Sequence, residues 1–365
     1  MRRLIAAGLL CLAASPAVAA GFKTENVIIM TADGIRVQEF FGGVDPVIFD
    51  SGDQAGIENI VSLRKEFWRD TPEARREALM PFLWTELLKE GILLGNPAKN
   101  SPVTVTNLHK VSYPGYAEIL TGFAQARIIN NNKIPNPSHT VLEFVQNEFK
   151  LGYTGVGAFG SWELFNWICA REKDPFYINA GYEAVPKKLL TPGMHPLNEL
   201  QFQMLTPWDS VRFDMVTLTL GLEYLKKYAP RIFFLSLGET DDWAHNRRYD
   251  RVVQTARLFD DALKTVWETV QSTKAYRGKT TLIITGDHGR GITPEDWTSH
   301  KGTIPGSEFI WMGVFGPDTP KQGELGDTPA TQSQVAATAA KFLGLDYNAA
   351  VPEAAPPVDA AFSKP

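Results

Sequence analysis

The sequence predicts an α/β domain in which helices cover both faces of a largely parallel central sheet. Two observations predict this class. Five short apolar segments have the character of buried strands, and amphipathic helical segments lie between them. Strands that are apolar along their whole length are typical of parallel sheets buried on both faces, and their alternation with helices indicates crossover connections. We find no internal repeat or dividing linker, so one domain is expected over residues 21–348.

Each predicted strand is a run of β-branched and apolar residues, a composition that favours strands. The first, NVIIMTADG, begins at Asn26 and ends in Asp33 and Gly34. The others lie within TGVGAFGSW, RIFFLSLGETDD, TLIITGDHG and EFIWMGVFGP. Because the carboxyl ends of parallel strands meet at one edge of a sheet, the polar residues that follow these strands are expected to gather there.

Three segments carry helix signals. TPEARREALMPFLWTELLKEG starts with Thr71 as a cap and Pro72 in the first turn, and is expected to end at Gly91. DSVRFDMVTLTLGLEYLKKYAP is expected to end at Pro230. The segment RYDRVVQTARLFDDALKTVWETVQ has one apolar face, formed by Val252, Ala256, Phe259, Leu263, Val266 and Val270.

The N-terminal segment indicates where the protein acts. Residues 1–20, MRRLIAAGLLCLAASPAVAA, combine two arginines, a short apolar run and a small-residue ending. This is typical of a secretory signal peptide, with cleavage after Ala19 or Ala20. We therefore expect a periplasmic or secreted protein with no stable membrane insertion after cleavage. The formal net charge of −5 argues against a nucleic acid duplex as partner.

The mature chain would keep one cysteine, Cys169, which excludes an intramolecular disulfide. Residues 349–365 are rich in proline and alanine, and we expect a loosely held tail there. The sequence gives no indication of the oligomeric state.

Acidic residues follow several predicted strands. Asp33 follows the first, Asp241 and Asp242 follow another, and Asp287 and His288 follow a third. Carboxylates brought together at one sheet edge repel one another, and like charges at close range do not all ionise. A bound metal ion removes this repulsion, so the convergence predicts a metal site. Without it, His288 would be a solvated residue in a polar turn.

The segment ETDDWAH places Asp241 four residues before His245, a spacing that lets both side chains meet one ion from a helical turn. Asp242 is the alternative carboxylate, and the spacing does not choose between them. An acidic helix N-terminus would show the same pattern. His300, in the loop DWTSHKGTIPG, is the candidate third ligand. The remaining histidines are interpreted as structural: His109, His139 and His195.

The segment VSYPGYAEILTG places the hydroxyl of Ser112 before a Tyr-Pro-Gly turn and a helical start. Serine at such a position is often a helix cap. The alternative is a nucleophile, because a metal lowers the pKa of a hydroxyl and the N–H groups of a helix N-terminus favour an incoming anion.

Taken in order, these motifs resemble the alkaline phosphatase superfamily, most closely its nucleotide pyrophosphatase/phosphodiesterase-like branch. Asp-Gly after the first strand, a hydroxyl in a turn to a helix, Asp-x-x-x-His, Asp-His-Gly and a final His follow the family's order. In the register of the branch's nucleophile motif, Thr-Phe-Pro-Asn and then Thr-Gly, this sequence has Ser-Tyr-Pro-Gly at residues 112–115 and Thr-Gly at residues 121–122. The resemblance spans residues 26–345 and implies an alkaline-phosphatase-like three-layer sandwich.

The resemblance also implies two divalent metal ions, for which zinc fits mixed imidazole and carboxylate ligands best and manganese is the alternative. It implies that Ser112 attacks the phosphorus of a small phosphate mono- or diester and forms a covalent phosphoseryl intermediate. The ligands it implies are Asp33, Ser112, Asp287 and His288 for one ion, and Asp241, His245 and His300 for the other.

Two departures from the family pattern bear on substrate binding. Gly115 stands where the branch has an asparagine that would donate to a phosphoryl oxygen, and RIINNNKIPN offers Asn130, Asn131 and Asn132 as replacements. We take Asn131 as the candidate substrate-binding residue. Tyr116 stands where the sulfatase motif Cys/Ser-x-Pro-x-Arg has its arginine, which disfavours an ordinary sulfatase.

Other functions of the same fold stay open at this stage. They are a sulfatase-like enzyme, a phosphonate hydrolase, and a binding protein that keeps the metal site without turnover, whereas a mutase is disfavoured by the signal peptide. Trp162, Asn166 and Trp167 are further candidates for substrate contact, although packing explains them equally well.

Overall fold

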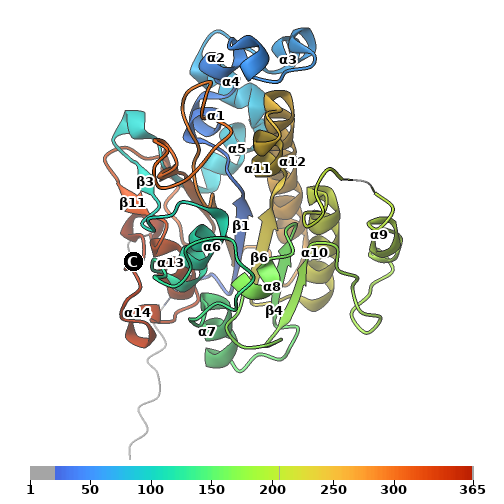
Figure 1. The fold of residues 1–365 in the computed structure, drawn as a ribbon. Helices are drawn as coiled ribbons and strands as arrows, with labels where there is room; N and C mark the ends of the chain where they lie inside the picture. Colours follow the sequence, from blue (N-terminus) through green and yellow to red (C-terminus); the bar gives the residue numbers. More distant parts are fainter. Residues whose placement is uncertain (1–20, 205, 364–365) are drawn as a thin grey trace, which may run out of the picture.

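The computed structural model of the chain describes residues 21–204 and 206–363. The predicted signal peptide, residues 1–20, lies outside the described residues. An eight-stranded sheet forms the central layer, and helices cover both of its faces (Figure 1). The predicted α/β class is therefore confirmed.

The strand order of the central sheet is β10-β2-β9-β7-β1-β6-β4-β5. All neighbours pair in parallel except β9, which runs antiparallel to both β7 and β2. The strands are β1 (Asn26–Ala32), β2 (Gly91–Leu94), β4 (Val156–Gly160), β5 (Tyr177–Ala180), β6 (Ile232–Leu237), β7 (Thr280–Thr285), β9 (Met312–Phe315) and β10 (Gly323–Glu324).

A second, three-stranded sheet has the order β11-β3-β8. It consists of β3 (Val103–Thr104), β8 (Phe309–Ile310) and β11 (Ala330–Thr331). The segment EFIWMGVFGP, expected to form one strand, is therefore divided between two sheets, with Trp311 at the crossing point. The Trp311 indole is buried and stacks on Phe40 with ring centroids 4.0 Å apart.

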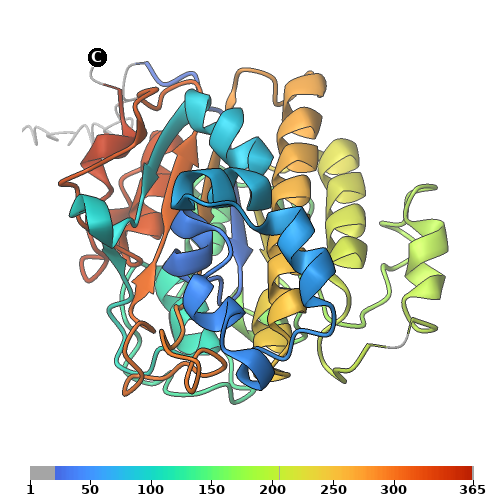
Figure 2. The same ribbon diagram turned by 90° about the horizontal axis from the view of Figure 1, so that it is seen from above.

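The helices differ widely in length, and the longest, α12, lies beside α10 on one face of the sheet (Figure 2). They are α1 (Val37–Gly42), α2 (Pro46–Phe49), α3 (Ile60–Phe67), α4 (Pro72–Leu79), α5 (Pro81–Thr85), α6 (Ser112–Thr121), α7 (Val141–Glu148), α8 (Phe165–Ile168), α9 (His195–Leu200), α10 (Asp214–Tyr228), α11 (Glu239–His245), α12 (Tyr249–Ser272), α13 (Gln334–Phe342) and α14 (Tyr347–Ala350).

Side-chain alternation along the strands divides the core into two layers. In β1, Ile28 and Met30 join the apolar cluster that includes α12, whereas Val27 and Ile29 join the cluster that includes α6 and α13. The predicted apolar face of α12 is confirmed, since all six of its residues are buried.

The helix expected over residues 71–91 is broken at Pro81. Thr71 caps α4 as predicted, because its hydroxyl accepts the Ala74 N–H at 3.2 Å. Pro81 has no N–H to continue the helix, so a separate helix, α5, begins there. The free N–H groups of Phe82 and Leu83 donate to the Asp260 carboxylate of α12, each at 2.8 Å, which stabilises the break.

The three central strands place their C-terminal ends together. Ala32 of β1 pairs with Leu237 of β6, and Thr31 pairs with Thr285 of β7. The residues that follow these strands, including Asp33 and Asp287, therefore begin at the same edge of the sheet. This edge is where ligands bind in open α/β sheets.

The C-terminal segment packs against the domain as far as residue 363, so the expectation of a loosely held tail is wrong for the described residues. Ala354, Val358 and Ala361 are buried in the cluster that includes α13. The N–H groups of Ala355 and Ser363 donate to backbone carbonyls at 2.8 Å each. Alanine and proline suit this segment because their compact side chains fit closely against the packed surface of the domain. Among the described residues, no helix is both long and apolar enough to cross a membrane.

Truncation after Ala350 is expected to destabilise the protein, because it removes this buried apolar surface. The expected loss is about 3 kcal/mol in the free energy of unfolding, or about 5 °C in Tm. Thermal unfolding followed by circular dichroism measures it, with truncation after Ser363 as the control. An unchanged Tm after truncation at Ala350 would show that the segment contributes nothing to stability.

Candidate metal centre

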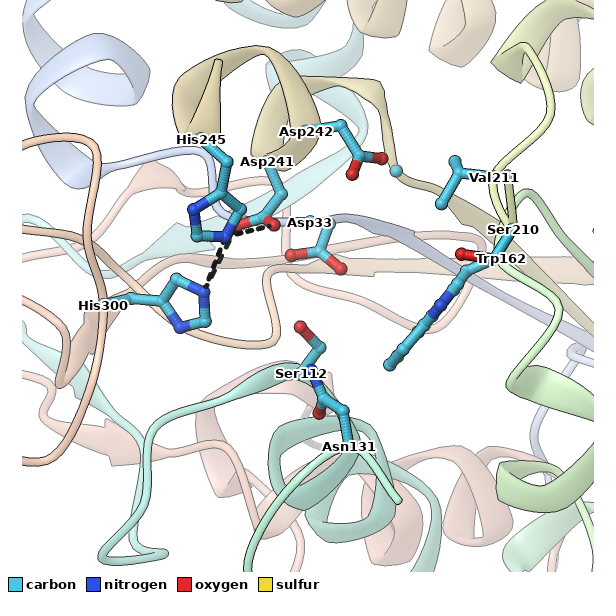
Figure 3. A pocket seen from close by; sticks show the side chains of 11 residues that line it. Asp33, Ser112, Asn131, Trp162, Ser210, Val211, Asp241, Asp242, His245 and His300 are labelled. Atoms are coloured by element: carbon cyan, nitrogen blue, oxygen red, sulfur yellow. Dashed lines mark hydrogen bonds and ion pairs between the residues drawn. The ribbon is translucent and has the colours of Figure 1, made fainter. Parts of the chain in front are cut away.

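A cavity of about 180 Å³ lies at the sheet edge where β1 and β6 end, between the N-termini of α6 and α11 (Figure 3). Eight of its lining residues carry polar side chains, and Trp162 and Val211 close the side opposite the histidines. The lining residues are Asp33, Ser112, Asn131, Trp162, Ser210, Val211, Gly238, Asp241, Asp242, His245 and His300.

Beneath the cavity, the structure brings together the four residues predicted for one metal ion. The His288 Nε2 atom lies 3.4 Å from Asp33 Oδ1, 3.2 Å from Asp287 Oδ2 and 3.4 Å from the Ser112 hydroxyl oxygen. Ligand atoms of Asp33, Asp287 and His288 all lie within 4.8 Å of one another. All four side chains are buried.

The protonation of His288 makes this cluster suited to a cation. Its Nδ1 lies 3.0 Å from the Gly289 carbonyl, and since a carbonyl only accepts, Nδ1 carries the hydrogen and Nε2 presents a lone pair. Among the described residues, Asp33 Oδ1 and Asp287 Oδ2 have no hydrogen-bond donor. Buried polar atoms are rarely left without a partner, so three acceptor atoms that face one another fit a bound metal ion.

The residues predicted for the other ion also come together. His245 Nε2 lies 3.0 Å from Asp241 Oδ2 and 3.1 Å from His300 Nε2, as Figure 3 shows. The Nδ1–H of His300 donates to the Lys110 carbonyl at 2.9 Å, which leaves its Nε2 as an acceptor. The rings of His288 and His300 stack with centroids 3.7 Å apart, so the two groups of ligands adjoin.

Asp241, and not Asp242, is the carboxylate that meets the histidines. Oδ1 of Asp241 lies 3.8 Å from His288 Nε2 and 3.7 Å from His300 Nε2. Among the described residues, Asp242 has no ion pair, although it lines the cavity. Burial, and next the Asp241 charge, raises the pKa of Asp242 to about 8.

The directions of the pKa shifts indicate that the buried carboxyl groups resist ionising together. Burial raises the pKa of Asp33 and Asp287 well above the usual range, and the neighbouring carboxylates raise it further. Burial lowers the pKa of His300 to about 4, so its imidazole is neutral at pH 7, as a metal ligand must be. A divalent cation would let the carboxylates ionise together.

Of two sequence comparisons with known proteins, one gives a match. The family model described as Metalloenzyme superfamily matches residues 215–347, the part of the chain that carries Asp241, His245, Asp287, His288 and His300. No curated protein sequence matches the chain.

Solved structures share the fold over most of the chain. A putative sulfatase from Bacteroides thetaiotaomicron has a TM-score of 0.56 and 13% identity, covering 88% of this chain and 71% of that one. A Vibrio parahaemolyticus protein of the alkaline phosphatase superfamily has a TM-score of 0.52 and 16% identity, covering 91% and 69%. The chain has an alkaline-phosphatase-like fold.

A third structure with this alkaline-phosphatase-like fold is murine ectonucleotide pyrophosphatase / phosphodiesterase 5, in an inactive form in complex with AMP. Its TM-score is 0.51 at 13% identity, and the match covers 88% of this chain and 95% of that one. At these identities the likeness establishes the fold.

Within the alkaline-phosphatase-like fold, Ser112 is the first residue of α6, and the cap position is occupied by Val111. The Ser112 hydroxyl lies 3.4 Å from His288 Nε2 and does not cap the helix, so the interpretation of Ser112 as a helix cap is wrong. The hydroxyl faces the cavity instead, with Asp33 across from it (Figure 3).

The structure explains why position 115 is a glycine. A Cβ atom at this position would overlap the carbonyl oxygen of Asp287, so no asparagine fits there. Asn131 lies beside Ser112 (Figure 3), and its Oδ1 accepts the Tyr113 N–H at 2.9 Å. Because that N–H only donates, the Asn131 oxygen is fixed toward it, and the amide NH₂ remains as a donor at the cavity. Asn130 and Asn132 do not line this cavity.

Trp162 lines the cavity, whereas Asn166 and Trp167 do not. Trp162 is held by a backbone bridge to Val211 and by a Glu163 N–H that donates to the Ser210 carbonyl at 3.0 Å. Two segments far apart in the sequence therefore form one apolar wall of the site.

Arg290 is a site residue that the sequence reasoning did not identify, although it directly follows Asp-His-Gly. Its buried guanidinium forms an ion pair with Asp241 and donates to the Thr298 carbonyl at 2.6 Å. Although burial opposes it, Arg290 holds the pKa of Asp241 well below the usual range, together with His245 and His300. Arg290 thus links Asp241 to the loop that carries His300.

Gly34 makes room for this ion pair. A Cβ atom at Gly34 would lie 2.8 Å from Asp241 Oδ1 and 2.9 Å from Arg290 Nε, and the backbone there has φ +63°. Both the space and the left-handed conformation require glycine.

Arg290→Met is expected to destabilise the metal-free protein by about 3 kcal/mol or more, because it leaves Asp241 buried without a cationic partner. The loss should be smaller in the zinc-loaded protein, where a bound cation compensates the carboxylate. Urea unfolding in EDTA and in zinc measures both, with the exposed Arg251→Met as control. Equal losses in the free energy of unfolding with and without zinc would show that Arg290 does not interact with the metal centre.

Proposed function

We propose that the protein is a periplasmic or secreted two-metal phosphohydrolase that cleaves phosphate mono- or diesters through a covalent phosphoserine at Ser112. The observation that carries this proposal is the convergence of lone pairs from Asp33, Asp287 and His288 beside the Ser112 hydroxyl. The metal-dependent hydrolases of phosphate and sulfate esters with this fold support the reaction class.

In this proposal the two ions, most favourably zinc with manganese as the alternative, lower the pKa of the attacking hydroxyl and stabilise the charge on the leaving oxygen. Asp33, Ser112, Asp287 and His288 would hold one ion. Asp241, His245 and His300 would hold the other.

The chain's own groups then carry out a two-step transfer. The Ser112 hydroxyl releases its proton to solvent, and its oxygen forms a bond to phosphorus while the bond from phosphorus to the leaving oxygen breaks. The leaving oxygen takes a proton from solvent. Water then attacks the phosphoserine, which releases phosphate, or the remaining monoester from a diester, and restores the Ser112 hydroxyl.

Asn131 supplies the hydrogen bond to the phosphoryl oxygen. In the phosphodiesterase-like branch an asparagine provides it at the position that Gly115 occupies in this chain. The Asn131 amide NH₂ faces the cavity next to Ser112, and its oxygen is held by the Tyr113 N–H. A donor fixed before substrate arrives stabilises a phosphoryl oxygen without reorganisation.

Tyr116, at the position of the sulfatase arginine, instead donates its hydroxyl to Asp33 Oδ2 at 3.1 Å. It therefore orients a proposed metal ligand, and this favours a phosphohydrolase over a formylglycine sulfatase. The location and the phosphodiesterase-like branch are supported by the N-terminal signal and by the Ser112 motif.

Ser112→Ala is expected to reduce kcat at least about a thousandfold, because it removes the nucleophile, while circular dichroism and bound zinc stay near those of the wild type. Hydrolysis of p-nitrophenyl phosphate, bis-p-nitrophenyl phosphate and p-nitrophenyl sulfate measures it. Ser210→Ala, another serine of the cavity, is the control and should retain most activity. Turnover in Ser112→Ala near the wild-type rate would refute the nucleophile assignment.

Asn131→Ala is expected to lower kcat about a hundredfold or more, the usual cost of removing a preorganised donor to the transition state. The neighbouring Asn132→Ala is the matched control, since Asn132 does not line the cavity. Steady-state kinetics on the preferred ester compare the two variants. Equal, small effects would exclude Asn131 as the donor.

A further inference from the structure

A second, larger hollow lies beside the metal centre. It has a volume of about 570 Å³ and is lined by three segments: Leu108, His109 and Val111 before the nucleophile, residues 129–131, and residues 301–303. We call it the Leu108 groove. Two of its segments pack tightly against each other, because a Cβ atom at Gly302 would overlap the Leu108 carbonyl oxygen.

The groove is continuous with the candidate site. Asn131 lines both hollows. Val111 directly precedes Ser112, and Lys301 directly follows His300. The Lys110 carbonyl between Leu108 and Ser112 accepts the His300 Nδ1–H at 2.9 Å, and Lys110 adopts a positive φ of 50° to present it. The groove therefore adjoins the metal centre next to both His300 and Ser112.

The groove is apolar and at the same time basic. Leu108 and Ile129 are 82% and 52% exposed, although both are large apolar side chains. Lys301 and His109 also line the groove, whereas no aspartate or glutamate does. Within the described part of the chain, the Lys301 ammonium has no ion-pair partner. The groove lining therefore carries one formal positive charge, at Lys301, and no negative charge.

We infer that the Leu108 groove binds the leaving alcohol of the substrate, and that this alcohol has an apolar body and an anionic group. The inference rests on the proposed function, in which His245 and His300 lie on the side of the leaving oxygen. In an in-line transfer the leaving group departs away from the attacking Ser112 oxygen. Leu108 and Ile129 then contact the body of the alcohol, and Lys301 pairs with its anionic group.

The test compares two esters with the same body. They are 4-carboxyphenyl phosphate, with an anionic leaving group, and 4-carbamoylphenyl phosphate, its neutral isostere, each also as the methyl diester. The wild type is expected to prefer the carboxylate about tenfold in kcat/KM, the value of one charge-assisted hydrogen bond. Lys301→Gln should reduce the preference to about one, Lys301→Arg should keep most of it, and Leu108→Ser should raise KM for both esters.

Lys264→Gln, an exposed lysine of α12, changes the net charge equally and should leave the preference intact. A second readout needs no turnover: 4-hydroxybenzoate should bind the zinc-loaded Ser112→Ala protein, and Lys301→Gln in that background should weaken binding about tenfold. Hydrolysis without a preference, or a preference that survives Lys301→Gln, overturns the inference and leaves the proposed function standing. No hydrolysis of any ester by the zinc-loaded protein refutes the proposed function, and the leaving-group assignment with it.

Discussion

The buried carboxylates at the edge of the central sheet set the constraint on which this molecule depends. Asp33, Asp241 and Asp287 surround the His288 ring, and water reaches none of them freely. Arg290 compensates one of these charges through its ion pair with Asp241. The Asp33 and Asp287 oxygens that face His288 have no such partner among the described residues. Buried charges are tolerated only when they are paired or bind a metal, and a carboxylate without such a partner takes up a proton instead, as the raised pKa values of Asp33 and Asp287 indicate.

The fold accommodates these buried carboxylates through two glycines, at which other groups of the site approach the backbone closely. Gly34 leaves space for the ion pair of Asp241 and Arg290, and Gly115 lets α6 pack against the Asp287 carbonyl. That second contact places Ser112 beside His288, and it also excludes an asparagine at position 115. The donor to the phosphoryl group must therefore come from another segment, and Asn131, fixed by the Tyr113 N–H, occupies that place.

Much of this arrangement could be predicted from the sequence because its signals are local. The apolar runs that end in Asp33 and in Asp287 and His288 predict buried strands with polar residues at their C-terminal ends. The spacing of Asp241 and His245 predicts one turn of helix. Contacts between distant segments gave no such signal. The break at Pro81 depends on Asp260 of α12, and the packed C-terminal segment depends on the surface of α13. The role of Arg290 depends on its ion pair with Asp241, and the two residues follow β7 and β6, which lie on opposite sides of β1.

The central claim is that these buried groups bind two divalent cations, and a calorimetric zinc titration of the EDTA-treated protein tests it most directly. The account predicts about two zinc ions per chain, proton release on binding as the raised pKa values of Asp33 and Asp287 require, and a higher Tm in the loaded protein. A folded protein that binds no zinc or manganese and shows the same Tm with and without them would contradict the account.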